Sequence, residues 1–170
     1  MTRRLQTLVA RGVAGLFLVV AAAFGLGATP AFAADSVTSY TVEGSIAADG
    51  MLDLKATLEL EGTPAQVQQR FATTLNSGRD GQYRFTVSDV TASVAGQAVS
   101  PTVAADGDYQ VVTVPTGGKG GTVEIAYKVR GAALDVGHDT TEVNWRVLQG
   151  LNLPVKTFDA TLTAPGMFTS

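Results

Sequence analysis

The 170-residue chain contains no cysteine, one histidine and one tryptophan, and only 16% of its residues are charged. Without cysteine there is no disulfide, thiolate zinc site, cysteine nucleophile or lipid-modified cysteine. The single imidazole, His138, leaves little room for a histidine-built metal site. The low charge argues against a coiled coil, an acidic disordered chain and a nucleic-acid binder driven by bulk charge. We therefore expect no metal and no cofactor.

The N-terminal segment 1–33 has the pattern of a secretory signal peptide. Three arginines precede an uncharged, mostly apolar run over 12–28, and Ala31-Phe32-Ala33 provides a small-x-small cleavage pattern. We predict a helical signal peptide over 1–33, cleaved after Ala33, and one exported domain over 34–170. An uncleaved N-terminal membrane anchor is the alternative.

Export changes the charge balance of the chain. Cleavage leaves 9 basic and 15 acidic residues, a net charge of −6. This balance argues against binding nucleic acid or an anionic lipid surface through a general basic face. No second apolar run approaches the length needed to span a bilayer, so we expect a membrane link only through a segment not present in this chain.

Apolar residues at every second position dominate 34–170. The even positions of 40–46 and 52–60 are mostly apolar, and charged or polar residues alternate with them. This pattern predicts a hairpin with one buried and one solvated face. Ile46 should lie opposite Leu52, which leaves the three-residue loop Ala48-Asp49-Gly50 with Gly50 in the left-handed region.

Further alternating stretches predict a total of about eight strands. The phase slips by one residue near Ser88-Asp89, which indicates a β-bulge or a strand that switches sheets. Ala95-Gly96 predicts a turn, and the glycines of 117–121 predict an exposed hairpin tip. One-sided sheets must cover each other, so we predict an all-β, antiparallel, immunoglobulin-like β-sandwich. The remaining predicted strands are 83–87, 90–94, 109–114, 123–129, 143–147 and 158–164.

Residues 64–75 permit two structures. Val67, Phe71 and Leu75 recur at a spacing of four, and Pro64 suits the first turn of a short helix. The alternation of Val67, Gln69 and Phe71 is equally compatible with a strand. The sequence leaves this choice open.

Groups that could carry catalysis or bind a metal are few. His138-Asp139, with Asp135 nearby, is an imidazole–carboxylate cluster, but no serine lies in a nucleophile-elbow motif, so we interpret it as a turn. Asp106-Gly107-Asp108 resembles the start of a calcium loop whose later ligands are missing. Glu59 and Glu61 share the solvated face of one strand about 7 Å apart, yet nothing in the sequence would keep one of them protonated.

Two further groups could contribute to binding. Trp145 is in step with Val143 and Val147, which favours a place in the core over an exposed platform for sugars. Four arginines could gather on one sheet face and bind an anion. They are Arg79, Arg84, Arg130 and Arg146.

The chain resembles the N-terminal extracytoplasmic domain of a bacterial family of predicted membrane proteins, domain of unknown function 2207. The resemblance covers about 36–166 and implies a β-sandwich outside the membrane, followed by transmembrane helices. It brings no known activity and no catalytic residues. The matching stretches are Ser39-Tyr40-Thr41-Val42 leading to Asp49-Gly50, Tyr83-Arg84-Phe85 leading to Asp89-Val90, Ile125-Ala126-Tyr127-Lys128-Val129, and Glu142-Val143-Asn144-Trp145 followed by Gly150 and Leu153-Pro154-Val155.

The chain departs from the family pattern in two ways. The family places a second tryptophan shortly after the first, where this chain has Leu151-Asn152-Leu153. The sequence also stops at Ser170, before any transmembrane helix, so we expect either a piece of a longer protein or a stand-alone domain.

We therefore expect a non-catalytic domain that forms the extracellular or cell-surface part of a membrane-anchored bacterial envelope protein. It should not be an enzyme, and it should have no catalytic, cofactor-binding or metal residues. Its partner would be an unknown protein or a component of the cell envelope. The alternatives are a secreted stand-alone binding or adhesion module, and a hydrolase that uses His138.

Overall fold

A computed structural model describes residues 34–76, 81–135, 137 and 141–164, and throughout these ranges the chain is built from strands, turns and loops. The predicted signal peptide over 1–33 lies outside the described residues. None of the described residues belongs to a helix long and apolar enough to cross a membrane. Thirteen strands are described: β1 Ser36–Ile46, β2 Leu52–Glu61, β3 Gln66–Ala72, β4 Thr74–Asn76, β5 Gln82–Arg84, β6 Thr86–Val94, β7 Gln97–Val99, β8 Thr102–Asp106, β9 Tyr109–Pro115, β10 Gly121–Arg130, β11 Ala133–Asp135, β12 Thr141–Val143 and β13 Phe158–Thr163.

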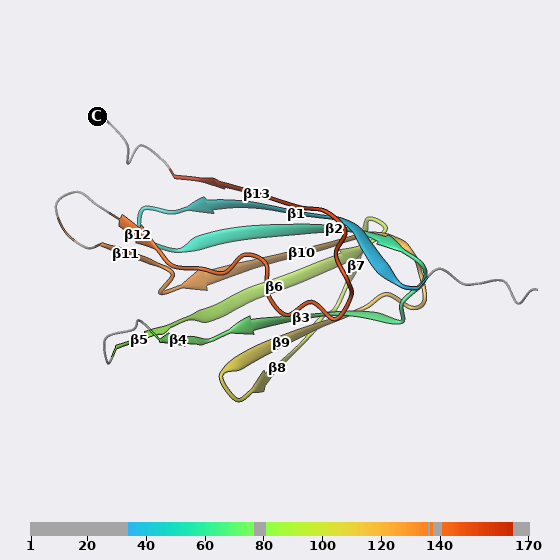
Figure 1. Ribbon diagram of the computed structural model, residues 1–170, viewed down its shortest axis with the longest axis horizontal. Coiled ribbons are helices and arrows are strands. Elements are labelled where there is room, and N and C mark those ends of the chain that lie inside the picture. Colours follow the sequence, from blue (N-terminus) through green and yellow to red (C-terminus); the bar gives the residue numbers. More distant parts are fainter. Residues whose placement is uncertain (1–33, 77–80, 136, 138–140, 165–170) are drawn as a thin grey trace, which may run out of the picture. The chain divides into compact units, whose positions relative to one another are not determined.

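The strands form two main sheets and two small hairpins (Figure 1). The larger sheet has six strands in the order β13-β1-β2-β10-β6-β7, and the smaller has three in the order β3-β9-β8. All described pairings within them are antiparallel except that of β13 with β1, which is parallel. The two-stranded hairpins are β4–β5 and β11–β12. Residues 64–75, which the sequence left open, therefore contain strands.

One apolar core lies between the two main sheets. The four inward residues of β10 are at most 2% exposed, as the alternation of 123–129 predicts. From the smaller sheet, β3 and β9 contribute buried valines and Phe71, whose ring lies 4.5 Å from that of Tyr127 on β10. The prediction of an all-β, antiparallel, sandwich-like fold is confirmed.

The first hairpin has the predicted register and turn. Ile46 lies opposite Leu52, and Gly50 has a φ of 77°, in the left-handed region. The backbone N–H of Ala47 donates to the carbonyl of Met51 at 2.8 Å and thereby closes the three-residue loop. A side chain at Gly50 would be strained because residues with a Cβ rarely adopt this conformation.

The phase slip near Ser88-Asp89, between the predicted strands 83–87 and 90–94, is a β-bulge within β6. Ala126 of β10 lies opposite Thr91, whereas Lys128 lies opposite Ser88, so β6 has one residue more than β10 between these pairs. Asp89 has a φ of 51° within the bulge. The extra residue reverses which positions face the core, so Val87 and Ala92 are both buried.

The prediction of a strand over 143–147 is wrong beyond Val143, where β12 ends. The backbone N–H of Asn144 still donates to the carbonyl of Ala132, but Trp145 then packs against core rings instead of continuing a ladder. The chain between β12 and β13, residues 144–157, is called here the connecting segment. Side-chain alternation alone did not reveal that its residues pair with two different sheets.

The connecting segment joins the edges of the two main sheets. It first pairs with β3, where the N–H of Arg70 donates to the carbonyl of Gly150 at 3.0 Å. It then reaches β1, where the N–H of Val37 donates to the carbonyl of Pro154 at 2.8 Å. Gly150 has a φ of 52°, and a Cβ there would lie 2.6 Å from the Cβ of Arg70, so glycine permits the close approach to β3. The connecting segment therefore covers the core on the side where it pairs with β3 and β1.

Strand β13 forms the outer edge of the larger sheet. Phe158, Ala160 and Leu162 are opposite Tyr40, Val42 and Gly44 in the parallel ladder and so share the core-facing side of the sheet. Phe158 and Leu162 nevertheless remain 39% and 45% exposed. The last predicted strand is confirmed, but its apolar row is only partly covered within the described residues.

Candidate functional site

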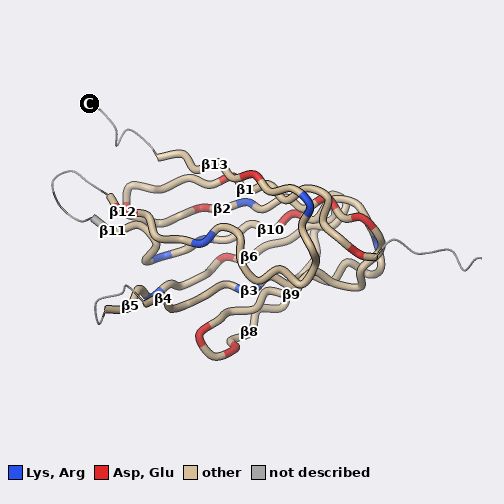
Figure 2. Tube along the Cα trace, in the orientation of Figure 1, with Lys and Arg blue, Asp and Glu red and all other residues tan. Residues whose placement is uncertain are grey.

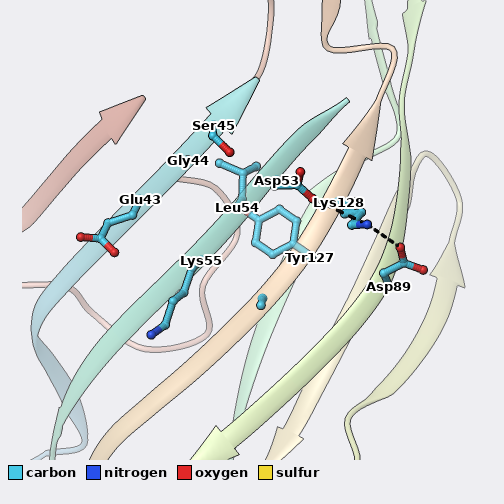
Figure 3. A pocket seen from close by; sticks show the side chains of 10 residues that line it. Glu43, Gly44, Ser45, Asp53, Leu54, Lys55, Asp89, Tyr127 and Lys128 are labelled. Carbon is cyan, nitrogen blue, oxygen red and sulfur yellow. Dashed lines mark ion pairs between the residues drawn. The ribbon is translucent and has the colours of Figure 1, made fainter. Parts of the chain in front are cut away.

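The solvated face of the larger sheet has a hollow of about 430 Å³ (Figure 3). It forms where β1, β2 and β10 lie side by side and β6 carries its bulge. The outward side chains come from cross-strand pairs: Glu43 opposite Lys55, and Ser45 opposite Asp53, which in turn lies opposite Lys128. Ala126 is small, so the hollow extends down to the sheet between these longer side chains.

Both lysines of the hollow form ion pairs, Lys128 with aspartates of the hollow and Lys55 with Glu124 beside it. The Nζ atom of Lys128 lies 3.4 Å from Asp89 Oδ2 and 3.9 Å from Asp53 Oδ1. Lys55 Nζ lies 2.6 Å from Glu124 Oε1. The hydrogen bond from Lys55 lowers the pKa of Glu124, and the same bond raises the pKa of Lys55. Both groups therefore stay ionised near neutral pH, which suits polar recognition better than proton transfer.

Glu59 and Glu61 both interact with side chains from other segments of the chain. Glu59 accepts a hydrogen bond from the hydroxyl of Thr122 at 2.9 Å. Glu61 accepts one from Ser36 at 2.9 Å and forms an ion pair with Lys156. The hydrogen bond from Lys156 is the main reason why the pKa of Glu61 is lowered. An acid catalyst needs the opposite shift, so Glu61 does not have the electrostatics of a glycosidase's acid.

The core has a buried aromatic cluster around Trp145. The tryptophan ring lies 5.9 Å from that of Phe71 and 5.3 Å from that of Phe85. Trp145 is half-buried and packs against the core, as its apolar spacing indicated. In the described part of the chain, its indole N–H and the hydroxyl of Tyr127 are buried without a hydrogen-bond partner.

The other candidates from the sequence are not brought together. His138 and Asp139 lie outside the described residues, and Asp135 is described only as a backbone position of β11. Asp106-Gly107-Asp108 forms the turn between β8 and β9, with Gly107 at a φ of 58°. Across the described ranges, no group of three or more histidine, cysteine, aspartate or glutamate side chains is placed to hold a metal ion.

The predicted cluster of arginines is arranged differently. Arg79 lies outside the described residues, whereas Arg84 and Arg130 are exposed at the ends of β5 and β10. Arg146 lies in the connecting segment and lines a hollow together with Arg70 of β3. Arg70 was missed because it lies in the stretch 64–75, where a helix and a strand would place it on different faces.

Comparison with known proteins identifies one family. The model described as "Predicted membrane protein (DUF2207) N-terminal domain" matches residues 36–170, which include every described strand. No curated protein matches the chain.

Two solved structures are similar to parts of this chain. Native yeast LTA4 hydrolase has 11% identity and a TM-score of 0.40, over 77% of this chain and 23% of that one. A two-domain M1 zinc metallopeptidase E323A mutant bound to L-tryptophan has 15% identity and a TM-score of 0.31, over 55% and 20%. The chain thus spans about a quarter or less of the length of these two structures.

Proposed function

The chain belongs to the DUF2207 family of predicted membrane proteins, and on this premise we propose that residues 34–170 are a non-catalytic recognition domain of a bacterial envelope protein. The family match over 36–170 carries the proposal because it links this sandwich to proteins described as membrane proteins. The signal-peptide pattern of 1–33 supports a place on the outer side of the membrane. The protein would be anchored through a segment outside this chain.

The chemistry of the surface supports recognition rather than catalysis. Lysine partners lower the pKa of Glu61 and of Glu124, and Glu59 and Asp89 are bound to a hydroxyl group and to a lysine, an arrangement that suits polar recognition better than proton transfer. Open hollows on a rigid sheet suit the binding of a partner or a polymer. A recognition domain needs only such a surface and a stable core.

Reporter fusions at Ser170 test the location. Alkaline phosphatase, which is active outside the cytoplasm, should be active when fused to the chain in a bacterial host, and deletion of 1–33 should abolish that activity. Green fluorescent protein serves as the opposite reporter because it fluoresces when it stays in the cytoplasm. An inactive phosphatase fusion together with a fluorescent protein fusion would contradict export.

A secreted stand-alone binding module is the second candidate. The exposed rings of Tyr109 and Phe158 favour it, since aromatic side chains at a surface often contact a partner. An antibody against the domain separates the two cases in the native organism. Recovery in the washed membrane fraction supports the anchored form, and recovery in the culture medium supports the secreted form.

A further inference from the structure

Two adjoining hollows of about 410 and 400 Å³ lie where β3, β9 and the connecting segment meet. They form one groove because Ala72, Tyr109 and Arg146 line both of them. One end of this arginine groove is lined by Arg70, Arg146 and Leu148, and the other end by Thr74 and Asp108. We propose that the arginine groove binds an acidic oligosaccharide, a chain of sugar rings that carries carboxylate or phosphate groups.

Arg70 is held in a fixed orientation at the basic end. Its Nη2 atom lies 2.8 Å from Asp106 Oδ2, and its guanidinium carbon lies 4.5 Å from the centre of the Tyr109 ring. Asp106 belongs to the acidic turn between β8 and β9 (Figure 2). Guanidinium has five N–H donors, so donors remain for a ligand after this ion pair forms. A preoriented arginine loses little conformational freedom when it binds a carboxylate or phosphate.

Arg146 supplies a positive charge that no described acidic group neutralises. It is exposed and forms no ion pair within the described ranges. Its backbone is fixed, because the side chain of Gln149 donates to the carbonyl of Arg146 at 2.7 Å and accepts from the N–H of Ala72 at 2.9 Å. The adjacent Trp145 is half-buried and packs against the core. At this end of the groove two arginines lie near one aspartate, an excess of one positive charge that complements an anion, whereas Asp108 at the other end balances that charge over the groove as a whole.

The remainder of the groove suits sugar rings. Tyr109 and Leu148 are 43% and 47% exposed and offer apolar surface to the C–H faces of a ring. Thr74 at the other end offers a hydroxyl group for hydrogen bonds. Asp108 would repel an anionic group there, so the charged part of the ligand should bind beside the arginines and neutral rings beside Asp108.

The strands around the groove disfavour an extended peptide as the ligand. β9 is paired on both sides, by β3 and β8, and β3 is paired by β9 and by the connecting segment at Gln68 and Arg70. At the basic end, β3 and β9 therefore have no free edge for strand addition, the mode in which backbone hydrogen bonds hold a peptide, whereas β4 at the other end is paired only with β5 among the described strands. A ligand beside the two arginines must therefore be recognised by side chains, as oligosaccharides are.

Calorimetric titration of the full chain tests the proposal. The probes are an oligogalacturonate, which carries carboxylates, a phosphate-linked oligosaccharide, the neutral galactose oligomer and a polyglutamate peptide. Arg146→Gln should weaken binding of the acidic oligosaccharide roughly tenfold, the effect of one charged hydrogen bond. Arg130→Gln is the matched control because it removes an exposed arginine at the end of β10. It should bind like the unmodified chain.

The titrations show whether the groove binds carboxylate groups or phosphate groups. Binding of either acidic oligosaccharide, weakened by Arg146→Gln and not by Arg130→Gln, supports the proposal and tells carboxylate from phosphate. Equal binding of the neutral oligomer, preference for polyglutamate, equal loss in both variants or no binding at all would overturn it. The proposal names a ligand for the proposed recognition domain and rests on that function. The titration uses purified protein, so its result is independent of the export assay.

Discussion

Ala95 occupies a backbone conformation that suits glycine or asparagine better than alanine. Its φ is 49° and that of Gly96 is 75°, so the predicted turn between β6 and β7 has two consecutive left-handed residues. A non-glycine residue in this region is strained by about 1 kcal/mol or more. Ala95 is exposed, and its backbone N–H donates to the carbonyl of Thr122 at 2.8 Å, so the turn is held in place while the side chain contributes little to packing.

Ala95→Gly should therefore increase the free energy of unfolding by about 1 kcal/mol, and Ala95→Asn by somewhat less. Urea unfolding measures the change. Ala98→Gly on β7 is the control and should lower stability, since glycine weakens a strand. A lower unfolding midpoint for Ala95→Gly would contradict the left-handed turn.

Tyr127 should make the protein sensitive to alkaline pH. Burial raises the pKa of Tyr127 to about 12. The nearby indole N–H of Trp145 makes this rise smaller, although it forms no hydrogen bond with the Tyr127 hydroxyl. Burial likewise raises the pKa of Tyr40. Unfolded tyrosine ionises near pH 10, so above that pH the unfolded chain loses protons that the folded chain keeps. The two buried tyrosines should leave the free energy of unfolding unchanged below about pH 10 and should lower it as the pH rises toward 12.

Tyr127→Phe should reduce this alkaline loss. At neutral pH the substitution should change stability by less than about 1 kcal/mol, because it removes a buried hydroxyl that lacks a hydrogen-bond partner. Urea unfolding at about pH 8 and about pH 11 measures both effects. Tyr109→Phe, which removes an exposed phenol, is the comparison. An unchanged alkaline slope in Tyr127→Phe would show that other groups cause the loss.

The sequence revealed inward residues better than site residues. Trp145 and the apolar positions of β10 were predictable because burial imposes a spacing on a strand. Arg70 and Tyr109 were not, since their contact joins β3 to β9 and depends on a register that no local pattern encodes. Arg146 was noted as an exposed arginine, but its place beside Arg70 depends on the route of the connecting segment.

The turn between β1 and β2 depends on Gly50. Gly50→Val should lower the free energy of unfolding by about 2–3 kcal/mol, because a β-branched residue at this φ is strained. A Cβ there would also lie 3.2 Å from the carbonyl oxygen of Ala133. Thermal unfolding measures the loss. Ala48→Val in the same loop is the control and should cost less, and equal losses would contradict the assigned role of Gly50.

Strands were predictable where they are long and have one buried and one solvated face. β1, β2 and β10 have ten or eleven residues with clear alternation, and their positions and the register of β1 with β2 were predicted. The short β4, β7, β8 and β11 were missed because three to five residues contain too little pattern. A strand was predicted at Trp145 because Val143, Trp145 and Val147 are apolar at every second position. In the structure Trp145 lies in the connecting segment and packs against Phe71 instead of belonging to a strand.

The connecting segment should be essential to the stability of the domain. Trp145, Leu151, Leu153 and Val155 pack against the core from it. Loss of these side chains would expose enough apolar surface to remove several kcal/mol, comparable with the total stability of a typical domain. Deletion of 144–170 should therefore abolish cooperative thermal unfolding. Deletion of 158–170, which removes the exposed strand β13, should only lower the melting temperature. If both deletions had the same effect on thermal unfolding, the connecting segment would not be the essential part.

The parallel pairing of β1 and β13 has a mechanical consequence. Both strands run in the same direction, so the backbone enters β1 at one end of the sheet and leaves β13 at the other (Figure 1). Tension between these two points would slide the strands along each other, and their hydrogen bonds would bear the load together rather than opening in turn. A domain loaded in shear resists extension better than one that unzips, which suits a link that must hold under traction.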